Sequence, residues 1–375
     1  MNKIITLPVI IAVLIAIKTY YGMAALGIGD QSDMGTIATL AIEMIGAYLI
    51  IKNIRLIKLS RMSYQWIPWS LWMLFTSFFY NPMPHGPAAF LGPIFCPIVF
   101  MLCHIMTIKY EQMEKTYTYF FSIFMVVLSI LCIMYSNVLA LDYNGDFYAS
   151  NMVFFPLCCI PFLFLIEDKK QKYLLLAVLF LVVLYTQKRS AAIVMMVVAL
   201  MELLNSSSKR NYAPAIFILF TIYFIMDSGV LGTYLDNMAF RLRTMNDDGG
   251  SGRTEIFPII WASLVNNDPM QWLIGRGEGS IVQTGFPNAH NDPLQLLYEY
   301  GLIGLVFYVV FVIRSIKSMI HLRRNKSKYY PGYFSCIAVI IIMGAVSNLF
   351  VFGSFFAFIC AYMGIVSAKT VLKSA

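Results

Sequence analysis

Long apolar stretches recur along almost the whole chain, and they constrain its fold more than any other feature. A helix needs roughly 20 apolar residues to cross the ~30 Å hydrocarbon layer of a bilayer. Hydrophobic residues make up 59% of the 375 positions and charged residues only 12%, which excludes an ordinary soluble domain. Helices satisfy their own backbone hydrogen bonds in lipid. The sequence therefore predicts an all-α, polytopic membrane helical bundle that forms one integral membrane domain over residues 1–375.

Hydropathy predicts about twelve membrane-spanning helices. They are expected over residues 5–28, 36–57, 65–80, 88–108, 118–140, 151–166, 172–187, 190–205, 213–230, 293–319, 332–350 and 352–369. The first apolar run is longer than the core of a typical signal peptide, so we expect it to be retained as a span. Lys18 interrupts this run, and a side chain that snorkels to the interface is the favoured interpretation over a ligand-facing role.

The connections between spans alternate in charge. Lys and Arg concentrate in the connections 51–61, 108–115, 167–172, 206–211 and 321–328, whereas 27–33, 80–87, 141–151 and 232–292 are poor in them. The positive-inside rule then places both termini in the cytoplasm and the long segment 232–292 outside. The net charge of +8 is thus mainly a topology signal and does not argue for nucleic-acid binding.

The seven cysteines all fall in apolar stretches, without a CxxC pair, and are expected to be small buried hydrophobic residues. The external segment holds no second histidine at a ligand spacing, so no metal site is expected.

The external segment 232–292 carries Arg241, Arg243, Arg253 and Arg276 but no lysine. Guanidinium groups make planar, bidentate contacts with phosphate or carboxylate and keep their charge, which suggests anion recognition. The alternative is that these arginines pair with the seven acidic residues of the same segment. The segment alone does not separate the two interpretations.

Lys188 and Arg189 interrupt another apolar stretch, and the predicted topology places this break at the external face. Charged residues near hydrocarbon usually face a polar cavity. Arg189 is therefore a candidate for an anion site that opens outward. The alternative is a tight external turn with snorkelling cations.

Residues 247–269 of the external segment contain a stripe of apolar residues at helical spacing, namely Ile256, Ile260, Trp261 and Leu264. It predicts a short amphipathic helix on the membrane surface, which Pro258 either starts or kinks. Such a helix would hold Arg253 at headgroup height. The following glycine-rich run, residues 275–279, lacks the context of a nucleotide site and is expected to be a turn that closes the segment back on the bundle.

His290 lies directly before the tenth predicted span. Asp292 as N-cap, Pro293 at the first helical position and Gln295 predict that the helix starts at Pro293. His290 then precedes a helix N-terminus, where anions are favoured, and its imidazole can act as a general base toward a hydroxyl or donate to a phosphate oxygen. The alternative is a structural hydrogen-bonding role. For Glu299, further along this helix, a structural role is favoured.

Four motifs around the external segment resemble one known family. "TQKRS", "SGRTEIFPIIW", "LIGRGEGS" and "HNDPLQLLYEYGLIGL" follow in this order over about residues 185–305. Together they look like the O-antigen polymerase and O-antigen ligase superfamily of lipid-linked glycan transferases. Outside this range the resemblance rests on hydropathy alone.

The resemblance implies a C-type glycosyltransferase-like membrane fold in the bacterial inner membrane that needs no metal or nucleotide cofactor. It implies an undecaprenyl-diphosphate-linked glycan as donor, and a chain-length regulator and a flippase as further partners. By this resemblance Arg189 and Arg253 contact the diphosphate, and His290 serves on the acceptor side. The remaining candidates, carried as substrate-binding groups, are Lys188, Arg241, Arg243, Arg276 and Glu299.

The function that this resemblance favours is an O-antigen or capsular polysaccharide polymerase. An O-antigen ligase that passes finished glycan to lipid A-core is the alternative within the same fold. We lean toward the polymerase because the external segment is short and only moderately basic, whereas a ligase also binds a heavily phosphorylated acceptor. A membrane transporter is the alternative from another class, and it predicts unusual residues paired at the midplane of two related halves.

Overall fold

The computed structural model describes residues 6–28, 33–80, 92–142, 151–186, 188–205, 249–350 and 353–374. Within these ranges the regular structure consists of α-helices and short 3-10 helices, without a strand. Six of the described helices are long and apolar enough to cross a membrane. The prediction of an all-α, polytopic membrane protein is confirmed.

The long helices of the bundle agree closely with the predicted spans. They are α1 (Thr6–Ile28), α2 (Met34–Lys52), α5 (Trp66–Tyr80), α7 (Phe95–Lys109), α8 (Met113–Asp142), α11 (Lys169–Thr186), α12 (Arg189–Asn205), α17 (Asp292–Arg324), α18 (Tyr330–Val346) and α19 (Gly353–Ser374). The shorter elements of the bundle are α3 (Ile54–Lys58), α4 (Arg61–Tyr64), η1 (Gly92–Ile94), η2 (Asn151–Val153), α9 (Phe154–Leu157) and α10 (Ile160–Leu163). The predicted span 213–230 lies outside the described residues.

The predicted span 151–166 differs from a continuous helix. The chain there forms η2, α9 and α10, which are only three or four residues long and are buried inside the bundle. Pro156 and Pro161 explain the interruptions, because proline lacks the N–H that an α-helix interior requires. The run is as apolar as a membrane span, so hydropathy did not reveal the breaks.

Helices α7 and α19 form the centre of the bundle, and both are largely buried. They approach closely at Gly364, where an added Cβ would lie 3.1 Å from the Cβ of Cys103. Aromatic rings fill the space beside them: Trp69 stacks on Trp66 at 4.8 Å and on Phe350 at 4.9 Å between ring centroids. All seven cysteines are buried and free, as the sequence predicted.

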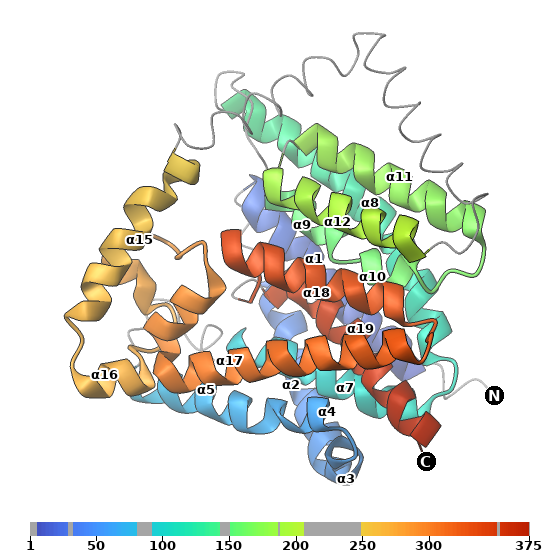
Figure 1. Ribbon diagram of the computed structural model, residues 1–375, viewed down its shortest axis with the longest axis horizontal. Helices are drawn as coiled ribbons and strands as arrows, with labels where there is room; N and C mark the ends of the chain where they lie inside the picture. Colours follow the sequence, from blue (N-terminus) through green and yellow to red (C-terminus); the bar gives the residue numbers. More distant parts are fainter. Residues whose placement is uncertain are drawn as a thin grey trace.

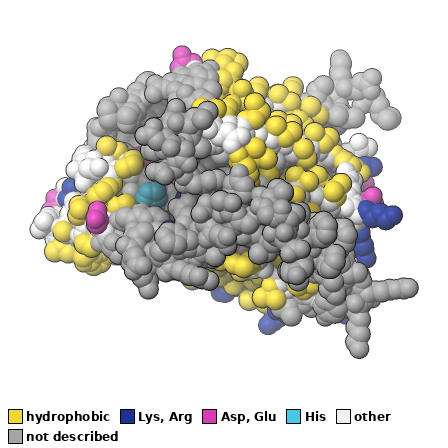
Figure 2. Space-filling view, turned by 90° about the horizontal axis from the view of Figure 1, so that it is seen from above, with side chains coloured by type: hydrophobic (Ala, Val, Ile, Leu, Met, Phe, Trp, Pro, Cys, Tyr) yellow, Lys and Arg dark blue, Asp and Glu magenta, His cyan; other side chains and the backbone are white. Residues whose placement is uncertain are grey.

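The bundle has two distinct ends. Helices α15 (Gly249–Val265) and α16 (Pro269–Ile274) stand beyond the bundle at the end where α17 begins, on the left in Figure 1. We call this the loop end. At the other end, where α17 finishes in Arg323 and Arg324, a group of Lys and Arg side chains gathers on the right in Figure 2, and we call this the basic end. Hydrophobic side chains cover the described surface between them (Figure 2).

Candidate functional site

Helix α17 is interrupted at Gly301, whose φ of 67° and ψ of −169° lie outside the helical region. The interruption leaves carbonyl groups that a continuous helix would have used. The N–H of Arg276 donates to the carbonyl of Tyr298 at 3.1 Å, and the N–H of Gly277 donates to that of Glu299 at 2.9 Å. The glycine-rich turn is therefore joined to the bundle by backbone hydrogen bonds, as the predicted role of residues 275–279 requires.

Close backbone approach makes glycine necessary on both sides of this junction. A Cβ on Gly275, which has a φ of 81°, would lie 2.6 Å from the backbone nitrogen of Gly301, and a Cβ on Gly301 would meet the carbonyl of Leu273. On the opposite side of the break, the indole N–H of Trp72 on α5 donates to the carbonyl of Tyr300 at 3.0 Å. The break is thus held from the loop and from the bundle together.

Arg276 reinforces the junction with its side chain. Its guanidinium donates from Nε to Asn267 Oδ1 at 2.7 Å, from Nη1 to the hydroxyl of Tyr298 at 3.2 Å and from Nη2 to the carbonyl of Ser263 at 3.3 Å. It also lies 5.1 Å from the centroid of the Tyr298 ring. These contacts tie α15, the segment before α16 and α17 to one another. Arg276 therefore has a structural role at the junction. The donor-binding role expected for it stays a prediction.

The apolar stripe of α15 packs inside the loop itself. Ile256, Ile260 and Leu264 are buried and form a small core with Ile281, Ala289 and Tyr298. The fourth residue of the predicted stripe, Trp261, is 53% exposed. The stripe therefore does not face a membrane, because apolar partners within the loop cover it. Ile259, Trp261 and Val265 are exposed on the other side of α15. If α15 lies at the membrane surface, this side contacts the lipid.

The remaining arginines of the external segment are less fully described. Arg253 lies in the first half of α15, with Pro258 inside the helix. Arg241 and Arg243 lie outside the described residues.

His290 is held in an unusual backbone conformation at the loop end. Its φ of 50° is positive, which costs a non-glycine residue about 1–3 kcal/mol. Its N–H donates to Asn288 Oδ1 at 3.3 Å, and the N–H of buried Ala289 donates to Gln295 Oε1 at 3.1 Å. On its other side, the amide of Asn291 donates to the carbonyl of Ala345 in α18 at 3.0 Å. The half-buried imidazole therefore projects from a segment that is fixed on both sides.

The start of α17 differs by one residue from the predicted one. The N-cap is Asn291, whose side chain accepts from the N–H of Leu294 at 2.9 Å, and Asp292 is the first helical residue. The carboxylate of Asp292 instead accepts from the N–H groups of Leu349 and Phe350, at 3.0 to 3.3 Å. Asp292 thus fixes the helix start to the connection between α18 and α19, a contact that local sequence does not reveal.

Arg189 and Lys188 lie at the loop end, between α11 and α12. Arg189 is the first residue of α12 and is half-buried, and Lys188 Nζ lies 5.6 Å from the centroid of the Phe154 ring. Helices α12 and α17 both pack against α18. The start of α12 and the residue before α17 therefore belong to the same end of the bundle (Figure 1).

A cavity of about 260 Å³ lies where the glycine-rich turn meets the bundle. Its lining includes Lys18 of α1, Thr39 of α2, Glu278 of the turn and Glu299 of α17. Lys18 therefore lines this cavity, which agrees better with the alternative, ligand-facing interpretation than with snorkelling to the interface. Glu299 accepts from the N–H of Gly279 and from the Gln295 amide, both at 3.1 Å, so it helps to hold the turn.

Two carboxylates, one that lines this cavity and one near its Lys18, have oxygens without a hydrogen-bond partner among the described atoms. They are both oxygens of Glu43, which is buried on α2, and Oε2 of Glu278. Burial, together with the nearby carboxylates of Glu299 and Glu43, raises the pKa of Glu278 well above its ordinary value. The sequence did not reveal Glu43 or Glu278 as site candidates, because their proximity to each other depends on how the turn folds onto the bundle.

The described residues contain no group of three His, Cys, Asp or Glu side chains that would hold a metal ion. The described part of the loop end offers two basic side chains at the start of α12, one imidazole before α17 and a cavity lined by carboxyl and hydroxyl groups.

Comparison with known families agrees with the sequence motifs. Residues 174–309 match the family model described as O-antigen ligase. The match covers most of α11, then α12, the loop and the first half of α17, and so includes Arg189, Arg253 and His290. The resemblance to the O-antigen polymerase and ligase superfamily is confirmed over this range. No curated protein matches the chain.

Replacement of Gly301 by alanine tests the junction. We expect Gly301→Ala to lower the thermal unfolding midpoint of the detergent-purified protein by roughly 5 °C or more, because it adds both backbone strain and a clash with the glycine-rich turn. Gly285→Ala is the control for a positive φ without a clash: its φ of 86° and ψ of 0° lie in the left-handed region, which costs alanine less than the conformation of Gly301, and no atom lies within 4 Å of the added Cβ. Equal midpoints for the two variants would contradict the account of the junction.

The raised pKa of Glu278 predicts a pH dependence of stability. The folded protein keeps this proton at pH values where the unfolded chain has lost it, so the contribution of Glu278 to stability falls as pH rises through the raised pKa. We expect the unfolding midpoint to fall from about pH 5 to about pH 9, and to fall less steeply in Glu278→Gln. Glu255→Gln, an exposed carboxylate on α15, should leave the slope unchanged. An unaltered slope in Glu278→Gln would refute the assignment.

Proposed function

We propose that this chain, which carries the O-antigen ligase family region over residues 174–309, is a polysaccharide polymerase. It would transfer a growing O-antigen or capsular glycan from undecaprenyl diphosphate to an incoming undecaprenyl-diphosphate-linked repeat unit. The observation that supports this most is that the matched region contains Arg189, Arg253 and His290 in the motifs that carry the resemblance. Lipid-linked glycans as substrates follow from the same family.

The arginines would stabilise the leaving group. In the proposed transfer the bond between the anomeric carbon and the diphosphate oxygen breaks, and negative charge develops on the diphosphate. Fixed guanidinium groups of Arg189 and Arg253 would stabilise this charge, since preorganised positive groups act strongly where water is excluded. The two guanidinium groups would supply the positive charge that the reaction needs, and no metal ion would be required. A lipid-linked diphosphate lies at headgroup height, which is where the predicted topology places the loop end.

His290 would serve the acceptor. A hydroxyl of the incoming unit forms the new bond to the anomeric carbon, and its proton passes to the imidazole as general base. The fixed backbone around His290, held through Asn288, Gln295 and Ala345, supports a positioned base rather than a mobile surface residue. Lys188 and Arg276, together with Arg241 and Arg243, remain proposed donor-binding groups.

The cavity beside the glycine-rich turn is a proposed site for part of the sugar. Glu278, Thr39 and Ser354 line it with carboxyl and hydroxyl groups, and Tyr300 adds an aromatic ring. Such groups hydrogen-bond the hydroxyls of a sugar ring. A volume of about 260 Å³ is below that of typical drug-sized pockets, which favours one ring over a longer chain. Glu299, which holds the turn, would act there through Glu278 and the Gly279 backbone.

The proposed location is the bacterial inner membrane, with both termini in the cytoplasm and the loop end in the periplasm. The concentration of Lys and Arg at the basic end supports this orientation (Figure 2). A chain-length regulator and a flippase are proposed partners, as the resemblance implies.

An O-antigen ligase is the second candidate, because the matched family model is described by that activity. The polymerase is favoured because the segment 232–292 contains four arginines, no lysine and seven acidic residues. This composition is poorly suited to a heavily phosphorylated lipid A-core acceptor. A transporter has less support, because the family match points to glycan transfer.

The purified full chain, given only undecaprenyl-diphosphate-linked repeat units, should lengthen the lipid-linked glycan. Gel analysis of the products measures this directly. Arg189→Ala and Arg253→Ala should each reduce the rate about 10²- to 10³-fold, and His290→Ala about 10²- to 10⁴-fold. Arg323→Ala, at the basic end, is the control and should keep the rate of the parent protein.

The same assay separates the alternatives. Lengthening without lipid A-core identifies a polymerase, whereas transfer only after lipid A-core is added identifies a ligase and refutes the proposal. Full activity of all three loop-end variants would show that the roles given to these residues are wrong. The proposed reaction would still stand.

A further inference from the structure

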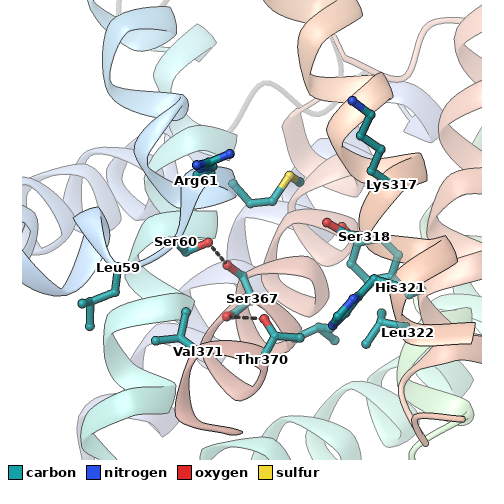
Figure 3. Close-up of a pocket in the computed structure, with 13 residues that line it drawn as sticks. Leu59, Ser60, Arg61, Lys317, Ser318, His321, Leu322, Ser367, Thr370 and Val371 are labelled. Atoms are coloured by element: carbon teal, nitrogen blue, oxygen red, sulfur yellow. Dashed lines mark hydrogen bonds between the residues drawn. The ribbon is translucent and has the colours of Figure 1, made fainter. Parts of the chain in front are cut away.

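A second concave site lies at the basic end, far along α17 from His290. It has a volume of about 430 Å³ and is enclosed by the start of α4, the last turns of α17, α18 and the end of α19. Figure 3 shows Arg61 on one side of this space and Lys317 and His321 on the other. No residue of the superfamily motifs lines it. We call it the basic-end pocket.

The charge of the basic-end pocket is unbalanced. Of its 13 lining residues, Arg61, Lys317 and His321 are basic and none is Asp or Glu. Along the described chain, neither Arg61 nor Lys317 has a carboxylate within 4.0 Å. The pocket therefore presents positive charge that the described part of the protein does not neutralise.

Neighbouring lysines at the same end behave differently. Lys328 Nζ lies 2.6 Å from Glu114 Oε1, and Lys369 Nζ lies 3.7 Å from Glu114 Oε2. Carboxylate pairing is thus available at the basic end and is used outside the pocket. The positive-inside rule explains why Lys and Arg are numerous at this end. It does not explain why Lys328 and Lys369 pair with a carboxylate while, among the described residues, Arg61 and Lys317 do not.

The pocket also has hydrogen-bonding groups in a defined arrangement. Ser60 Oγ and Ser367 Oγ lie 2.6 Å apart, and Thr370 Oγ1 donates to the carbonyl of Ser367 at 2.8 Å. Ser318 of α17 contributes another hydroxyl opposite them (Figure 3). Hydroxyl, guanidinium and ammonium groups are the donors that phosphate oxygens accept from.

The rim of the pocket is apolar at Leu59, a lining residue that is 58% exposed. A soluble anion gains nothing from such a rim, whereas acyl chains would cover it. Cations at the end of a membrane bundle also lie at the height of lipid headgroups.

We infer that the basic-end pocket binds the phosphate of an anionic membrane lipid. Arg61 and Lys317 contact the phosphate from opposite sides, the hydroxyl proton that the Ser60–Ser367 pair does not use between its own oxygens is donated to a remaining phosphate oxygen, and an acyl chain lies along Leu59. This site is separate from the proposed donor site, which lies at the loop end.

Native mass spectrometry of the detergent-purified full chain tests this inference, with phosphatidylglycerol, phosphatidylcholine and inorganic phosphate as probes. We expect retention of phosphatidylglycerol, weaker retention of phosphatidylcholine and no competition by millimolar inorganic phosphate. The variant Arg61→Gln/Lys317→Gln should weaken phosphatidylglycerol binding roughly thirtyfold, as expected for two lost cations near an anionic headgroup.

The double variant Arg323→Gln/Lys326→Gln is the matched control, because it removes the same charge from exposed residues outside the pocket. It should retain the affinity of the parent protein within a few-fold. Both substituted pocket side chains are exposed, and thermal unfolding of each variant verifies folding. Equal losses in the two variants would overturn the inference in favour of a diffuse surface potential. Displacement of the lipid by inorganic phosphate would overturn its assignment to a lipid.

Discussion

The geometry of the loop end depends on the backbone hydrogen bonds at the break in α17. A helix inside a bilayer cannot leave carbonyl groups unpaired without a cost of several kcal/mol each. At Gly301 these groups are taken by Arg276 and Gly277 of the loop and by Trp72 of α5. The loop is therefore a part of the membrane bundle and not an appendage to it, since its removal would leave the break unsatisfied.

This junction explains why charged groups from distant parts of the sequence meet. The turn that pairs with α17 also carries Glu278 toward Lys18 and Glu299. The buried side of α15 packs on Ile281, which follows this turn, and the strained segment at His290 is fixed between Ala289 and Asn291. The hydrogen bonds at the break thus position the carboxyl-lined cavity and the segment on which the helix that bears Arg253 packs, whereas contacts to Gln295 and Ala345 fix the His290 segment.

The sequence predicted the long helices better than it predicted the contacts that hold the loop end together. Span boundaries follow from hydropathy, which is a local property, and most were correct within a few residues. Asp292 illustrates the limit: its side-chain type suits an N-cap, yet its partners are the N–H groups of Leu349 and Phe350, more than 50 positions away. Arg276 and Lys18 show the same limit, because the same side chain can bind an anion, clamp a turn or line a cavity.

We propose that the lipid diphosphate binds at the loop end, within reach of His290. Cryo-electron microscopy of the full chain with a non-transferable undecaprenyl-diphosphate-linked glycan would locate it. We expect density for the diphosphate between Arg189 and Arg253, with the sugar directed toward His290 and the glycine-rich turn. Density for the diphosphate at the basic end or along the midplane of the bundle would contradict it.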